Sequence, residues 1–191
     1  MANVNAADGF SPVRHLTGAP FNGQGQLCYL ASGESNNIFI GDLVTPAGSA
    51  DTVTGAPTVT RAAAGDKIAG AVIGFDVSAG LTPNLNIAYR PASTAMYVYV
   101  STATDLIYEV QAFGTVSATD VGLNADLKTG TGSTTTNRSG FSLDSSTTST
   151  TSTLGFHIMR AVQKPNNALG QYVRLEVIPN VHAYAPNTAG Q

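Results

Sequence analysis

The residues of this chain with the greatest capacity for chemistry are three histidines and one cysteine, and they stand far apart. They are His15, Cys28, His157 and His182. No two histidines are two or four residues apart, and none has a carboxylate at the spacing of a local zinc or catalytic motif. Cys28 lies in an apolar run and has no second cysteine to pair with, so we predict a small buried hydrophobic side chain.

Several aspartates occur where this residue usually forms turns. Asp42, Asp66, Asp76 and Asp105 lie beside glycines or at the ends of predicted strands, where an Asp side chain commonly hydrogen-bonds to the nearby backbone. A glycosidase requires two carboxyl groups facing across a cleft, but any twelve acidic residues contain such a pair by chance. The motifs G-x-x-x-x-G-K-[ST] and G-x-S-x-G are absent. We therefore predict a protein that is not an enzyme, with no cofactor and no metal.

Charge is scarce along the whole chain. Charged residues make up 11% of the sequence, against about a quarter of an ordinary soluble domain. The nine Lys and Arg residues are scattered singly and the formal net charge is −3, so we expect no direct nucleic-acid binding. No stretch approaches about 18 apolar residues, and residues 1–8 have neither a cationic start nor an apolar run. We expect neither a membrane anchor nor a secretory signal.

Apolar residues recur with a period of two along most of the chain, which is the pattern of β-strands. In the segment 96–100, three apolar residues alternate with Tyr97 and Tyr99. Further strands are predicted at 27–31, 37–44, 67–75, 106–113, 121–128, 155–162 and 172–178. At most one helical turn is expected, at 117–120. The predicted fold class is all-β: a compact β-barrel or β-sandwich of short antiparallel strands with an extended N-terminal arm and essentially no helix.

A tract rich in Ser and Thr lies between these strands. In the segment 129–153, 17 of 25 residues are Ser or Thr, a composition that suits sheets which contact another surface. Phe141 and Leu143 restore the two-residue period inside the tract. We therefore predict a hairpin loop at 129–138, a short strand, and a second loop near 145–152.

The first 26 residues follow neither the strand period nor the helix period. Their large apolar side chains are spaced irregularly among glycines and prolines, so the segment is predicted to be an arm that docks on a partner, the alternative being a frayed terminus. The candidate partner-binding residues are Phe10, Val13, Arg14, Leu16 and Phe21. Deleting the arm is expected to abolish binding and leave a folded body. The predicted organisation is an arm at 1–26, a β body at 27–182 that could divide into two small units near 92–105, and a tail at 183–191.

Three segments of the chain stand out by their composition. They are Gly41-Asp42-Leu43-Val44, Ala64-Gly65-Asp66-Lys67-Ile68-Ala69-Gly70-Ala71-Val72-Ile73-Gly74-Phe75, and the opening Asn5-Ala6-Ala7-Asp8-Gly9-Phe10-Ser11-Pro12-Val13-Arg14. In these segments the chain resembles the small β-rich decoration, or cement, proteins of tailed-bacteriophage heads. The Ser/Thr-rich tract departs from that resemblance.

The resemblance implies a structural virion protein on the outer surface of an icosahedral phage head. Such proteins bind the expanded capsid, often as trimers at threefold positions, and clamp neighbouring shell subunits. The implied partners are the major capsid protein and sister copies in a homotrimer, without nucleic acid or membrane, and the implied location is the virion after synthesis in the host cytoplasm. A shell presents the same epitope many times, so several modest contacts engaged together suffice for binding.

Two other classes of function stay open. One is a receptor- or glycan-binding β module of a phage fibre or adhesin, with Tyr97, Tyr99 and the Ser/Thr loops as its contact surface, since aromatic rings flanked by hydroxyls suit sugars. The other is a small hydrolase on a β-barrel. A histidine and a carboxylate within hydrogen-bond distance in a cleft would point to that class.

Overall fold

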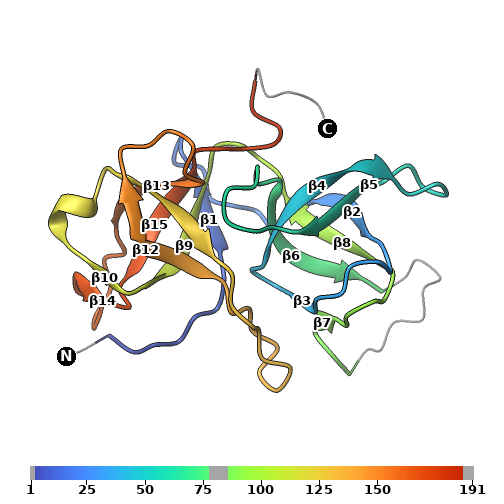
Figure 1. Cartoon of the computed structure of the whole chain (residues 1–191), viewed down its shortest axis with the longest axis horizontal. Coiled ribbons are helices and arrows are strands. Elements are labelled where there is room, and N and C mark those ends of the chain that lie inside the picture. The colour runs from blue at the N-terminus through green and yellow to red at the C-terminus, as the bar shows by residue number, and fades with distance from the viewer. Residues whose placement is uncertain (1–2, 78–85, 187–191) are drawn as a thin grey trace.

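The alternating segments of the chain form short β-strands, which close into two barrels lying side by side along the long axis of the molecule (Figure 1). The computed structural model describes residues 3–77 and 86–186. Within these ranges the helical structure is one 3-10 turn, η1 (Ala118–Asp120), inside the turn predicted at 117–120. No helix of the described chain is long and apolar enough to cross a membrane. The all-β prediction is confirmed.

The first barrel is closed and contains the strands from Gln26 to Ser101. Its strands are β2 (Gln26–Leu30), β4 (Leu43–Ala50), β5 (Pro57–Arg61), β6 (Gly70–Asp76) and β8 (Met96–Ser101), in the order β2-β5-β4-β6-β8. A separate two-stranded ribbon consists of β3 (Ile38–Phe39) and β7 (Tyr89–Arg90). The segment 46–57 is largely a hairpin, because β4 continues to Ala50 and β5 begins at Pro57.

The second barrel is a six-stranded sheet in which five strands complete a ring. They are β9 (Leu106–Phe113), β11 (Asn124–Lys128), β12 (Ser142–Ser149), β13 (Phe156–Ala161) and β15 (Arg174–Pro179). The order β9-β12-β11-β13-β15 returns to its start because β15 also pairs with β9. β1 (Ser11–His15) pairs with the first half of β9, and β10 (Thr115–Val116) pairs with β14 (Gly170–Gln171).

The two barrels have the same connectivity. In each, the first strand along the chain pairs in parallel with the third, and the third pairs with the second. The second then pairs with the fourth, the fourth with the fifth, and the fifth with the first. The molecule is therefore a tandem repeat of one five-stranded topology, and the short link 102–105 joins its two halves.

The barrels are joined by a shared apolar core. Leu43, Ile68 and Ala71 of the first half belong to the same buried cluster as Tyr108 and the inner residues of the second half. Next to this core the backbones of β6 and β8 approach closely. A Cβ at Gly70, where φ is +154°, would collide with the carbonyl oxygen of Ser101, so this position requires glycine.

The N-terminal segment is docked on its own chain, whereas it was predicted to dock on a partner. Phe10 is fully buried in the shared core, with its ring stacked on Phe156 at a centroid distance of 4.6 Å. Its backbone N donates a 2.8 Å hydrogen bond to the carbonyl oxygen of Gly41, and β1 then pairs with β9. Phe10 is therefore unavailable as a partner-binding anchor, and removal of residues 1–26 would open the core.

The Ser/Thr-rich tract is more ordered than its composition suggests. Its strand β12 continues to Ser149 and so takes up most of the segment 145–152, which was expected to be a loop. The irregular second half of β12 covers Asp126, whose backbone N donates a 2.8 Å hydrogen bond to Oγ1 of Thr147. Asp126 is therefore buried although it is charged.

Replacing Phe10 with Ala should lower the free energy of unfolding by about 3–5 kcal/mol, because the change leaves a cavity in the shared core. Val13→Ala, on the exposed flank of β1, should change it by less than about 0.5 kcal/mol. Chemical denaturation followed by circular dichroism measures both values. Equally small effects would contradict the docking of the N-terminal segment and restore a free arm.

Candidate functional site

The remaining predicted partner-binding residues surround β1 on the surface of the second barrel. Val13 and Leu16 are 43% and 53% exposed, so both stay available for contact. Arg14 is half-buried in a 2.6 Å ion pair with Glu176. Phe21 packs partly against the shared core. The structure thus brings these four side chains to one region but leaves Val13 and Leu16 as its exposed apolar groups.

The structure also brings together one histidine and one carboxylate that are far apart in the sequence. Nδ1 of His15 lies 3.0 Å from Oδ1 of Asp105, and His15 borders a shallow depression of about 270 Å³. A hydrolytic site would add a nucleophile hydrogen-bonded to the free ring nitrogen. In the described chain no hydroxyl or thiol donates to His15. The pair joins β1 to the segment 102–105.

The other chemically capable residues are buried or bound to neighbours. Desolvation raises the pKa of Cys28 to about 11 and lowers the pKa of His182 to about 4, so both are neutral at neutral pH. Nδ1 of His157 lies 2.9 Å from Oδ1 of Asn124. Among the described residues no group of three or more His, Cys, Asp or Glu side chains could hold a metal ion.

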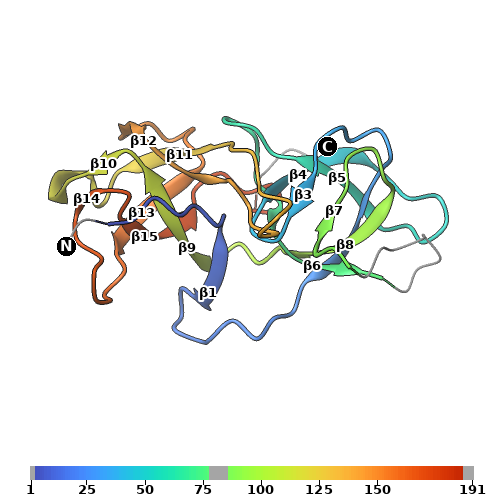
Figure 2. The same cartoon turned by 90° about the horizontal axis from the view of Figure 1, so that it is seen from below.

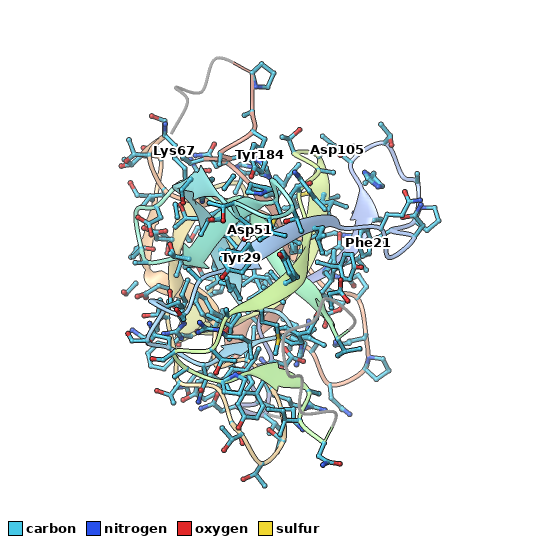
Figure 3. All side chains as sticks on the ribbon, turned by 90° about the vertical axis from the view of Figure 1, so that its right-hand side faces the viewer. Phe21, Tyr29, Asp51, Lys67, Asp105 and Tyr184 are labelled. Atoms are coloured by element: carbon cyan, nitrogen blue, oxygen red, sulfur yellow. The ribbon has the colours of Figure 1, made fainter. Side chains whose placement is uncertain are left out.

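The aromatic surface required for the glycan-binding alternative is incomplete. Tyr97 is buried: its hydroxyl donates to Oδ2 of Asp51 at 2.7 Å, and its ring lies 5.3 Å from that of Tyr29. Hydrogen bonds from Thr54 and Tyr97 hold the pKa of Asp51 below its usual value. In the view of Figure 3, Phe21 and Asp105 lie to one side of Asp51 and Tyr29. Tyr99 alone of the two predicted tyrosines is exposed.

One candidate binding surface is a groove that the sequence did not identify. It has a volume of about 440 Å³ and lies between residues 5–7, the end of β9 and the hairpin 129–140 of the Ser/Thr tract. Phe113, 47% exposed, lies beside it. The only sequence signal was the Ser/Thr tract itself, which was predicted to contact another surface. We call this feature the hairpin groove.

The hairpin 129–140 is held in place by the first barrel, toward which it reaches (Figure 2). The Arg61 guanidinium donates to the carbonyl oxygen of Gly130 and stands 4.7 Å from the ring centroid of Phe141. Gly132 lies so close to the ring of Phe39 that a Cβ there would collide with it. The groove wall is therefore positioned by contacts between the two halves of the molecule.

A buried carboxylate anchors the base of this hairpin. Oδ1 of Asp42 accepts a 2.5 Å hydrogen bond from Oγ of Ser139, and Oδ2 accepts one from the backbone N of Phe39 at 3.0 Å. Desolvation raises the pKa of Asp42 to about 6, although these hydrogen bonds and the nearby Arg61 oppose the shift. Asp42 is thus a polar link between the first barrel and the hairpin. Its carboxyl group stays protonated to a higher pH than an ordinary aspartate does.

The hairpin groove carries positive charge. Nζ of Lys128 stands 4.4 Å from the ring centroid of Phe113 and 3.5 Å from Oδ2 of Asp144. Arg138 lines the groove, is exposed, and has no ion-pair partner among the described residues. The groove therefore offers an apolar surface with one uncompensated cation, which suits an acidic group on an apolar partner.

Comparison with known proteins adds no relative. No family model, no curated protein and no solved structure matches this chain. The geometry alone carries the functional argument.

Asp42→Asn tests the raised pKa of this carboxylate through the pH dependence of stability. The folded wild type binds the proton of Asp42 more tightly than the unfolded chain does, so its stability falls as pH rises from about 4 to about 6. The amide has no such charge. Its oxygen can still accept from the backbone N of Phe39, while its NH2 group can donate to Oγ of Ser139 in place of the bond that the carboxylate accepts. The difference in the free energy of unfolding between the variant and the wild type should shift in favour of the variant by up to about 3 kcal/mol as the pH rises from about 3.5 to about 7. A difference that is constant with pH would show that Asp42 titrates normally.

Proposed function

We propose that this protein is a structural, non-enzymatic virion protein that decorates the outer surface of an icosahedral phage head and bridges neighbouring major capsid subunits. The observation that carries the proposal is the tandem repeat of one barrel topology in a single body. A shell displays the same subunit surface at regular intervals. A molecule with two like halves is suited to engage two neighbouring copies of that surface at once.

The shared core makes the bridge stiff. Since Phe10, Leu43 and Tyr108 belong to one buried cluster, the two halves cannot separate without exposing apolar surface. Once one half binds, the other is held near its own site, and the second binding event becomes intramolecular. Two modest contacts then give strong retention on an assembled shell and weak binding to an isolated subunit.

The exposed surface of both halves supports broad contact. Ile40, Val53 and Tyr99 are exposed large hydrophobic residues on the first half, as are Val13 and Phe113 on the second. Scattered apolar groups on a surface with little charge fit an interface of ordinary polarity and extended area. Binding to the assembled shell and not to its separated parts stabilises the shell by mass action.

The proposal extends to assembly and location. We propose that the protein is made in the host cytoplasm, associates with the outside of the expanded head, and does so as a homotrimer around threefold positions. Of the two tyrosines on which the glycan-binding alternative depends, Tyr97 is buried. No observation favours that alternative over decoration.

Purified protein mixed with expanded shells of the cognate major capsid protein should co-sediment with them and saturate at a fixed high copy number. Decorated shells should withstand heating or chelation better than bare ones, because bound protein stabilises the assembled state. Unexpanded shells and isolated capsid subunits are the matched controls. Failure to sediment with expanded shells, together with binding to a glycan array, would replace this proposal with the receptor-binding alternative.

A further inference from the structure

The N-terminal segment beside the hairpin groove is extended and hydrogen-bonded along one edge only. The backbone N of Ala6 donates to Oε1 of Gln111 at 3.0 Å, and the carbonyl oxygen of Val4 accepts from Nε2 of Gln111 at 2.7 Å. The carbonyl oxygen of Ala6 accepts from Arg174 at 3.2 Å. The backbone groups of Val4 and Ala6 therefore face the body of the second barrel.

In an extended chain the backbone groups of successive residues point to opposite sides. The N–H and C=O groups of Asn5 and Ala7 accordingly face away from Gln111, and both residues line the hairpin groove. Neither residue has a backbone hydrogen bond to any part of the described chain. These four groups form a short unpaired stretch of backbone outside any strand of the molecule, and like a free strand edge it is open to pairing with another chain.

The two barrels close, so open strand edges are confined to β1, to the ribbons β3–β7 and β10–β14, and to unpaired segments such as residues 5–7. Strands in a closed ring are paired on both sides and leave little backbone for an incoming chain. At the hairpin groove, a free edge, an apolar surface at Phe113 and an unpaired cation at Arg138 occur together. The combination matches strand addition, in which main-chain hydrogen bonds supply affinity and side-chain pockets supply specificity.

We propose that the hairpin groove binds an extended, acidic segment of the major capsid protein, which adds as a strand beside residues 5–7 and places a carboxylate against Arg138. The proposal rests on the proposed function and names the contact through which the second half of the molecule holds the shell. The partner is a peptide because the free N–H and C=O groups of residues 5–7 are the donors and acceptors that another backbone can match. It is acidic because the cation has no internal partner, and it is short because the groove has the volume of a small-ligand site.

Two pairs of variants test the groove, each with a matched control. Ala7→Pro removes the groove-facing N–H, whereas Val4→Pro makes the same kind of change on the opposite edge, where no N–H is engaged. Arg138→Glu reverses the groove cation. Lys67→Glu makes the same charge change at a cation that has no ion-pair partner in the described ranges and lies outside the groove. Thermal melting of each variant checks that it is folded.

In co-sedimentation with expanded shells, Ala7→Pro should weaken binding about tenfold and Arg138→Glu about tenfold or more. Val4→Pro and Lys67→Glu should stay within about twofold of the wild type, the scale of a surface change away from the contact. If the wild type decorates shells and all four variants bind equally well, the groove proposal is overturned while the decoration proposal stands. If the wild type itself does not bind, the decoration proposal fails first and this one with it.

The identity of the occupant is tested with a photoreactive amino acid at Thr136, an exposed position that lines the groove. Illumination of decorated shells should link this position to an acidic segment of the major capsid protein, identified by mass spectrometry of the digested product. Crosslinks only to a sister copy of this chain would overturn the assignment and make the groove a trimer contact. Crosslinks to neither protein would overturn it as well.

Discussion

The junction between the two barrels is the constraint on which the rest of the structure depends. One apolar cluster contains residues of both halves, and Phe10 fills it from the N-terminal segment. Because that ring is enclosed, the segment before it is drawn along the surface of the second barrel, where it becomes one wall of the hairpin groove. The opposite wall is held from the first barrel by Asp42 and Arg61. The groove therefore exists only when both halves are docked. A substitution at the junction alters the groove even when the substituted residue does not line it.

Ring closure explains how so weakly charged a β protein keeps few open edges. Each barrel satisfies its backbone internally, so its outer face can carry Ser, Thr and scattered apolar residues without offering long strand edges to other chains. The free edge at Asn5 and Ala7 is short, which limits indiscriminate pairing while leaving room for one selected segment. Repetition of the topology adds a second like half at a fixed position, so under the proposed function modest affinity in each half is enough for retention on a repeating lattice.

Local patterns predicted local structure well. The alternation in 96–100 and 106–113 predicted β8 and β9, and the 3-10 turn follows from Ser117 and Asp120, whose side chains satisfy each other's backbone as a capping box. The repeated topology was not predictable, because it is defined by pairings between distant strands such as β9 and β12 and not by shared residues. Phe10 was wrongly predicted to bind a partner for a similar reason. It is buried because it lies between the two halves, and the sequence pattern of its own segment does not indicate this. The hairpin groove was missed because its walls come from opposite ends of the chain.

The central claim is that one rigid two-barrel body bridges neighbouring subunits of a repeating shell. A cryo-electron-microscopy reconstruction of expanded shells saturated with this protein tests it most directly. We expect density for both barrels on each bound molecule, with the two halves contacting adjacent capsid subunits and a continuous strand of shell density entering the hairpin groove. Density showing one barrel in contact and the other free in solvent, or no ordered density on the shell, would contradict it.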